Sequence, residues 1–273
     1  MVLPSMSHPL EWVQSTKSDP SRISFLDLPR EIRDEIYQHA YCVLGDIFMF
    51  TEDPFKVRPV VKAKVVWNKS SDGEAHDPIS IGKVIPVSLL RVCRQLHAES
   101  SEVLFGYNTF RLYSSHVGFG PRYQHLVRNI VFSTDSMIQK IFENDLESVG
   151  YWWRRYFWKD IYSKSERLLE AFPNLEKLTF PIKSNRHGQS WIPVFMAAGQ
   201  RTREYRVNIA ALWLKSKCPI DNDRLRDCLH MEITHNGIQK SMYAGSRFAL
   251  FTLEDEEWDH TEFAEAFEKM KFL

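Results

Sequence analysis

The segment FPNLEKLTF, residues 172–180, carries the pattern that decides the fold of the second half of the chain. Leu178 and Phe180 are separated by a single residue, which is the period-two alternation of a β-strand that buries one face. Two other segments share this pattern, LVRNIVF at 126–132 and LRDCLHM at 225–231. We interpret the three segments as a weak internal repeat, and chance similarity among short apolar segments is the alternative.

The spacing of the repeat indicates how its strands are connected. The central residues Ile130, Leu178 and Leu229 lie 48 and 51 positions apart, and helical stretches near 143–171 and 201–216 separate them. Strands that alternate with helices favour parallel pairing through crossover connections. We therefore expect an α+β fold whose second half is a small sheet with crossover helices.

The first half of the chain begins with a predicted helix over residues 28–40. An apolar residue recurs at every fourth position, at Leu28, Ile32, Ile36 and Ala40. This spacing gives a helix one apolar face, with polar residues on the opposite side. Pro29 fits this prediction because the first turn of a helix tolerates proline.

A strand pair and a second helix follow the first helix. Residues 46–51 and 61–67 are rich in β-branched and aromatic residues, which predicts an antiparallel pair. The second helix is predicted over residues 88–105, and Leu89 and Val92 belong to its apolar stripe. Together these elements predict a helix–β-hairpin–helix unit.

These patterns suggest three parts along the chain. We expect residues 1–22 to form a disordered tail, because they are polar and lack any period. Residues 23–115 form the helix–hairpin–helix unit, and residues 116–273 form a repeat-like α/β region packed on it. Within that region we also expect a strand at 247–253 and a closing helix that starts near Asp259.

The composition excludes several classes of protein. The 273 residues contain 35 Lys and Arg against 35 Asp and Glu, so no overall charge attracts nucleic acid or anionic membranes. No apolar run approaches the roughly 20 residues needed to cross a bilayer, and the start of the chain does not resemble a secretory signal. Four scattered cysteines do not indicate a disulfide framework. We expect an intracellular protein, in the cytoplasm or the nucleus, without a membrane partner.

No pattern of catalytic or metal-binding residues emerges. Ligand types that suit zinc lie within one 18-residue span, at Cys218, Cys228, His230 and His235. Their spacing does not match a compact zinc site. Cys93 and His97 are one helical turn apart, but a cysteine on an apolar stripe is disfavoured as a thiolate. We therefore predict no catalytic residue, no metal and no cofactor.

The segment YWWRRYFWKDIY at 151–162 has the most unusual local composition. As a crossover helix, it would pack Trp153, Phe157 and Ile161 on the sheet. Some aromatic side chains would then remain exposed, which is typical of a protein-binding surface. The candidates for such a surface are Tyr151, Trp152, Tyr156 and Trp158. Base stacking with phosphate pairing is the third and less favoured interpretation.

Two segments carry a family resemblance, FLDLPREIRDEIYQHAY at 25–41 and SLLRVCRQLHAESSEVLFGYNTFRL at 88–112. Together they resemble a group of uncharacterised fungal proteins with a degenerate F-box-like N-terminal domain. The matching positions are Leu28, Pro29, Glu31 and Ile32, then Leu89, Leu90, Cys93, Arg94 and Gln95, then Tyr107, Asn108, Thr109 and Phe110. The resemblance covers about 42 residues and the hairpin between them.

An F-box is a compact three-helix unit that docks on the small adaptor subunit of cullin-type ubiquitin ligases. The resemblance therefore implies adaptor-facing residues at Leu28, Pro29, Ile32 and Ile36. Here about 45 residues of β character separate the two helices, which departs from the family pattern. The alternative is that the helices simply pack on each other and on the hairpin. A core position for Ile32 and Ile36 is a further alternative to an adaptor-facing one.

The second half has a resemblance of its own, to the leucine-rich substrate domain of some F-box proteins. FPNLEKLTF at 172–180 is its best example, although the period exceeds the 20–29 residues of true leucine-rich repeats. We predict a non-enzymatic protein-interaction module, in the form of a degenerate F-box-type adaptor. The alternatives are an unrecognised enzyme or small-ligand-binding domain, which requires a deep pocket, and a nucleic-acid binder acting through 151–162.

Overall fold

The computed structural model describes residues 23–52, 60–66, 77–112, 119–132, 150–151, 153–184, 202–235 and 260–273. The predicted tail 1–22, the predicted strand 247–253 and the start of the closing helix at Asp259 lie outside these residues. Among the helices in the described ranges, none is both long enough and apolar enough to cross a membrane.

The strands of the described ranges form one sheet in the order β3-β2-β1-β4-β5-β6-β7. They are β1 (Asp46–Glu52), β2 (Val60–Val66), β3 (Ile79–Ser80), β4 (Thr109–Leu112), β5 (Asn129–Phe132), β6 (Lys177–Ser184) and β7 (Leu229–His235). β1 pairs with β2 in antiparallel fashion, as the hairpin prediction requires. β4 pairs with both β1 and β5, so the two predicted regions contribute to the same sheet.

The prediction of parallel strands in the second half is confirmed. β5 pairs with β6, and β6 with β7, in parallel. The register places Ile130 opposite Leu178, and Leu178 opposite Leu229. The central residues of the three predicted repeats are therefore direct neighbours across the strands.

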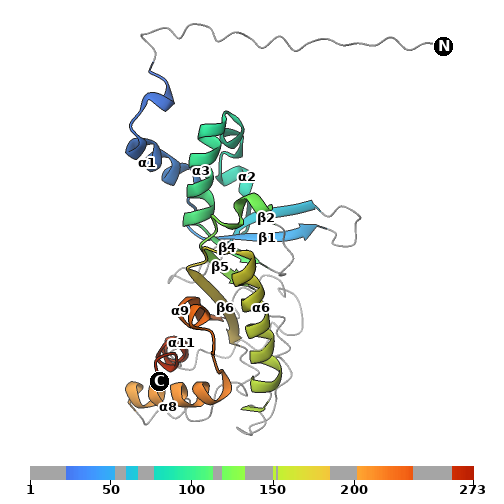
Figure 1. Cartoon of the computed structure of the whole chain (residues 1–273), viewed down its shortest axis with the longest axis vertical. Coiled ribbons are helices and arrows are strands. Elements are labelled where there is room, and N and C mark those ends of the chain that lie inside the picture. The colour runs from blue at the N-terminus through green and yellow to red at the C-terminus, as the bar shows by residue number, and fades with distance from the viewer. Residues whose placement is uncertain are drawn as a thin grey trace, which may run out of the picture.

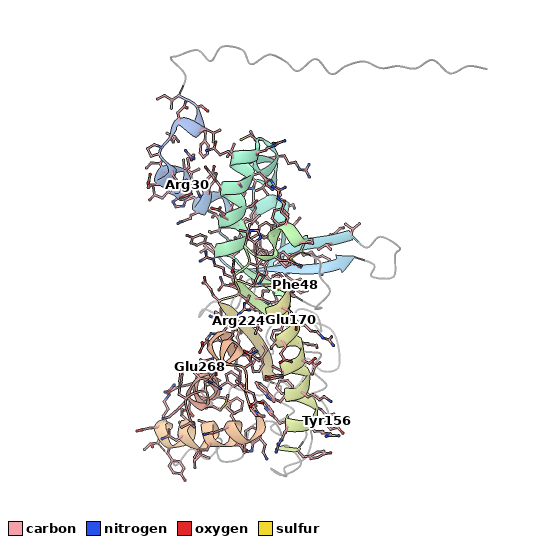
Figure 2. The ribbon with its side chains drawn as sticks, viewed as in Figure 1. Arg30, Phe48, Tyr156, Glu170, Arg224 and Glu268 are labelled. Atoms are coloured by element: carbon pink, nitrogen blue, oxygen red, sulfur yellow. The ribbon has the colours of Figure 1, made fainter. Side chains whose placement is uncertain are left out.

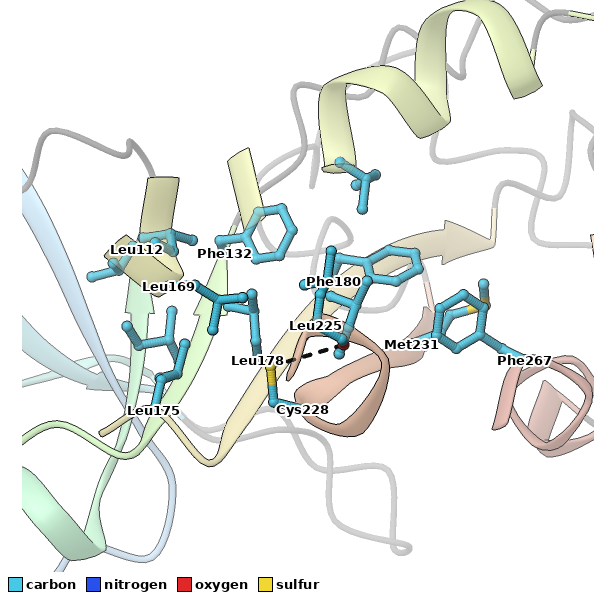
Figure 3. Close-up of a cluster of buried hydrophobic side chains, with 14 of the residues drawn as sticks. Leu112, Phe132, Leu169, Leu175, Leu178, Phe180, Leu225, Cys228, Met231 and Phe267 are labelled. Carbon is cyan, nitrogen blue, oxygen red and sulfur yellow. Dashed lines mark hydrogen bonds between the residues drawn. The ribbon is translucent and has the colours of Figure 1, made fainter. Parts of the chain in front are cut away.

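The core lies on the face of the sheet that carries these central residues. A row of neighbours crosses six strands, through Val65, Ile47, Phe110, Ile130, Leu178 and Leu229. Each of these side chains is at most 3% exposed. Figure 3 shows how Leu178, Phe180 and Met231 lie among side chains from the neighbouring helices, including Leu169, Leu225 and Phe267. Alternation along each strand therefore sends one set of apolar residues into a single core.

Helices α3 (Arg94–Tyr107), α6 (Trp158–Ala171) and α11 (His260–Met270) cover this apolar face of the sheet, and their aromatic side chains contact its rings. The other longer helices are α1 (Arg30–Tyr41) and α8 (Arg203–Lys217). The shorter ones are η1 (Phe25–Asp27), α2 (Ile81–Val84), η2 (Val87–Arg91), α4 (Pro121–Gln124), the π-helical turn η4 (Trp153–Phe157) and α9 (Asp223–Cys228). Phe105 of α3 stacks on Phe110, and Trp158 of α6 and Phe267 of α11 both contact Phe180. Figure 1 shows α1 and α3 at one end of the long axis, and α8 and α11 at the other.

The opposite face of the sheet carries charged side chains. Arg111 of β4 lies 2.6 Å from the carboxylate of Asp46 on β1 and 3.6 Å from that of Glu232 on β7. Burial raises the pKa of Glu232, and Arg111 opposes this shift. These ion pairs therefore tie strands from the two halves of the sheet across its second face.

The start of the second helix differs from the prediction. α3 begins at Arg94. Cys93 has an extended backbone and caps the helix through its Sγ, which accepts a hydrogen bond from the Leu96 amide. The preceding residues form the 3₁₀ turn η2, so Leu89 and Val92 leave the predicted stripe and are 41% and 62% exposed. A 3₁₀ turn has three residues per turn, which shifts side chains away from the direction that an α-helix would give them.

Candidate interaction surfaces

The inner side of α1 is held by charged and hydrogen-bonding groups. The Arg33 guanidinium donates to the two Glu99 carboxylate oxygens of α3, at 2.9 and 2.8 Å. Arg33 also donates to the carbonyl oxygens of Leu26 and Leu28, which fixes η1 against α1. The Tyr37 hydroxyl donates to Glu99 at 2.9 Å. Helix packing at this point therefore depends on one carboxylate that accepts bonds from several groups.

The electrostatics of this cluster follow from its geometry. The hydrogen bond from Arg33 lowers the pKa of Glu99 to about 2, and bonds from Gln95 and Tyr37 act in the same direction. Burial raises the pKa of Tyr37, and so does its hydrogen bond to Glu99, which favours the neutral phenol as donor. At neutral pH the cluster holds an ionised carboxylate with its donors already in place.

This inner contact decides which side of α1 faces outward. Arg33, Tyr37 and Tyr41 are four residues apart and form the buried stripe of the helix. The predicted apolar stripe lies about 100° away from it, so Ile32 and Ile36 are 45% and 41% exposed. α1 and α3 therefore pack on each other, as the alternative expects, but Ile32 and Ile36 do not belong to the core.

The four residues predicted to face an adaptor lie at the start and on the outer side of α1. Pro29 is the exposed residue that precedes α1, and Leu28 is half-buried between η1 and α1. We call Leu28, Pro29, Ile32 and Ile36 the α1 surface. More exposed apolar side chains follow, at Val84 of α2, at Val87 and Leu89 of η2, and at Val92, which comes directly after η2. Sequence reasoning placed Leu89 and Val92 inside, and Pro86, which precedes the predicted helix, gave no signal of the change at Cys93.

The described cysteine and histidine side chains do not come together as a catalytic pair or a metal site. His97 lies 2.7 Å from the Leu90 carbonyl and 2.9 Å from the Tyr123 hydroxyl through its two ring nitrogens, so neither nitrogen serves Cys93. The buried thiol of Cys218 accepts a bond from Trp153, and His230 pairs with Glu268. The described part of the chain contains no cluster of three or more metal-ligating side chains.

No protein-family model matches the chain, and comparisons with curated proteins and with solved structures also give no match. The surfaces themselves are therefore the basis for any statement about function.

The second candidate surface surrounds η4. The exposed fractions of Tyr151 and Tyr156 are 63% and 57%, and their rings meet edge to face with centroids 6.4 Å apart. Arg154, Arg155 and Lys159 are exposed beside them. Two of the four predicted aromatic residues thus form an exposed pair with cations around it.

The other two aromatic candidates do not join this pair. Trp158 is 3% exposed, so its predicted place on a contact surface is wrong. Its ring packs near Phe180 and Phe267, and its indole N–H donates to the Pro219 carbonyl at 2.9 Å. Trp152 lies outside the described residues.

The π-helical turn explains this division of the aromatic residues. The predicted inward set, Trp153, Phe157 and Ile161, is buried as expected. An α-helix would turn Trp158 away from Trp153, whereas the wider π turn, with its i to i+5 bonds, keeps them on one side. Three consecutive residues, Arg154, Arg155 and Tyr156, are then left on the outside. The same wide turn brings Tyr151 and Tyr156, five residues apart, into contact.

Proposed function

We propose that this chain is a non-enzymatic protein-interaction module whose α1 surface docks the small adaptor subunit of a cullin-type ubiquitin ligase. The observation that carries the proposal is the outward stripe of Ile32 and Ile36, 45% and 41% exposed, on a helix whose other side is occupied by Arg33 and Tyr37. Apolar stripes on helices are ordinarily turned toward a core. A helix that presents one outward is suited to a protein partner.

The F-box resemblance supports the same choice of partner. The residues that carry it at the start of the chain, Leu28, Pro29 and Ile32, belong to the α1 surface. By the same resemblance, the second half would correspond to a leucine-rich-like substrate-binding region, and the protein would work inside the cell, in the nucleus or the cytoplasm. No covalent chemistry is required of this chain in such a role.

Calorimetric titration of the full chain with the purified adaptor subunit tests the proposal. We expect Ile32→Lys to weaken binding at least about tenfold, because a buried charge replaces an apolar contact. Pro29→Ala should weaken it less, since only the contact of a small ring is lost. Circular dichroism must show that both variants remain folded.

Leu212→Lys is the matched control for Ile32→Lys. Leu212 is an apolar residue of α8 that is 60% exposed, and Figure 1 places α8 at the end of the molecule opposite α1. Replacing an apolar side chain by lysine at that end should leave adaptor affinity within about twofold of the wild type. The proposal would be rejected if the folded wild type did not bind the adaptor, or if Ile32→Lys and Leu212→Lys weakened binding equally.

A further inference from the structure

The surface around η4 has features that point to a partner different from the adaptor. It consists of Tyr151, Arg154, Arg155, Tyr156, Lys159 and Lys217, and we call it the tyrosine–cation surface. Tyr156 projects away from the body of the molecule, far from Arg30 of α1 along the long axis (Figure 2). A ligand held here would leave the α1 surface accessible.

The positive charge of this surface is not neutralised within the described part of the chain. No carboxylate of those residues lies within ion-pair distance of Arg154, Arg155 or Lys159. Some other surface arginines are paired, since Arg30 pairs with Asp34 at 2.7 Å and Arg128 with Glu176 at 3.0 Å. Two neighbouring guanidinium groups can therefore form bidentate bonds with carboxylates brought by a ligand.

A fourth cation approaches the surface from another helix. Lys217, the last residue of α8, comes so near Gly150 that an added Cβ there would lie 2.7 Å from its Cε and 3.1 Å from its Nζ. The bare backbone of Gly150 leaves room for this side chain at a place three residues before η4 begins. The cations of the surface thus come from both α8 and the η4–α6 segment.

The tyrosine pair adds contact area of the kind found at protein interfaces. Tyrosine and arginine are enriched where binding energy concentrates, because a rigid ring loses little conformational entropy on binding. The π turn that brings Tyr151 and Tyr156 together is a rare element, and such turns recur at functional sites. Its geometry leaves the pair outside while Trp153 and Phe157 anchor the turn in the core.

We propose that the tyrosine–cation surface binds an acidic segment of a protein partner. Four cations suit a short run of carboxylates, whereas nucleic-acid binding commonly involves about 6–10 phosphate contacts and a basic face. The exposed carboxylate of Asp160 borders the surface and the chain has no net charge, which also disfavours a polyanion. This inference rests on the proposed function, since it assigns a second partner to the same interaction module.

Fluorescence anisotropy with the full chain tests this inference. The probe is a labelled octapeptide with four central Asp and Glu residues flanked by Gly and Ser, and its control carries Asn and Gln instead. We expect the acidic peptide to bind at least tenfold more tightly than the control. The double variant Arg154→Gln, Arg155→Gln should weaken it about tenfold, and so should Tyr151→Ala with Tyr156→Ala.

A matched charge change elsewhere separates local recognition from net charge. Arg91 and Arg94 are exposed near the start of α3, and the double variant Arg91→Gln, Arg94→Gln should change peptide affinity less than twofold. Equal affinity for both peptides, no binding at millimolar peptide, or tighter binding of an RNA octamer would overturn the inference. Both titrations with Ile32→Lys distinguish the two proposals, because this variant should weaken adaptor binding at least about tenfold and leave peptide binding unchanged.

Discussion

The two ends of the molecule place polar and apolar side chains in opposite ways. Between α1 and α3, the buried contact includes the hydrogen-bonded cluster of Arg33, Tyr37 and Glu99, while Ile32 and Ile36 face outward. The directional hydrogen bonds of this cluster fix the position of α1 against α3.

The end formed by η4, α6, α8 and α11 has the reverse arrangement. Trp153 is fully buried, with ring contacts to Phe157, Trp213 and Phe263, and its indole N–H bonds Cys218. Arginines and tyrosines occupy the outside. Apolar burial surrounds Trp153 at this end, and ion pairs such as Arg206 with Glu262 join α8 to α11 beside it.

The different interiors of the two ends explain how a helix can keep an exposed apolar stripe. At the α1 end, the ion-pair cluster fixes the helix, so Ile32 and Ile36 are not needed for packing. At the η4 end, the aromatic core fixes the helix, so the cations are not needed for packing either. The side chains that hold α1 and η4 from the inside differ in type from the exposed ones beside them, and this leaves both surfaces suited to partners.

The largest expected effect is at the aromatic end. Trp153→Ala should lower the free energy of unfolding by about 3–5 kcal/mol, because it removes a large buried ring from a closely packed site. Urea denaturation followed by circular dichroism measures this change. Tyr156→Ala, three residues away and 57% exposed, should change the free energy by less than about 0.5 kcal/mol. Similar effects of the two variants would remove the contrast between interior and surface at this end.

A smaller effect is expected from the ion-pair cluster at the other end. Glu99→Gln should lower the free energy of unfolding by about 1–3 kcal/mol at neutral pH, because buried donors lose a charged acceptor. Since the pKa of Glu99 is held at about 2, below its usual 4.5, its contribution is complete above pH 4.5. The difference between wild type and Glu99→Gln should therefore shrink as the pH falls from 4.5 toward 2. Urea denaturation at pH 7, 5, 4 and 3 follows this trend.

Glu102→Gln is the control for the acid dependence. Glu102 also pairs with an arginine, Arg30, at 3.1 Å, but both side chains are exposed and solvent screens them. This variant should follow the wild type at every pH. A Glu99→Gln difference that stays constant down to pH 3 would show that the charge of Glu99 does not hold the two helices.

The sheet was predictable from sequence because its residues alternate. Ile130, Leu178 and Leu229 were identified as equivalent from their spacing, and the register makes them direct neighbours. Alternation specifies strand faces strongly when one face is buried, since a slip of one residue would expose the whole set. The parallel order followed from the helices between the strands.

The interaction surfaces were harder to predict, for two physical reasons. Periodicity groups Ile32 with Ile36 but does not say which side of a helix is buried, and the partner that decides it, Glu99, is 66 positions from Arg33. The π turn adds a residue to one helical turn, so the α-helical spacing gave the wrong direction for Trp158. In both places a contact distant in sequence, or a rare backbone turn, overrides the local pattern.

The smallest expected effect tests the comparison most directly. Ile36→Ala should change the free energy of unfolding by less than about 0.5 kcal/mol, because the side chain is 41% exposed and alanine favours helix. Ile47→Ala makes the same change at a side chain that is 1% exposed and should lower the free energy by about 2–5 kcal/mol. Urea denaturation of the pair measures both. A loss above 2 kcal/mol at Ile36 would make it a core residue, and the α1 surface would then have no apolar stripe to offer a partner.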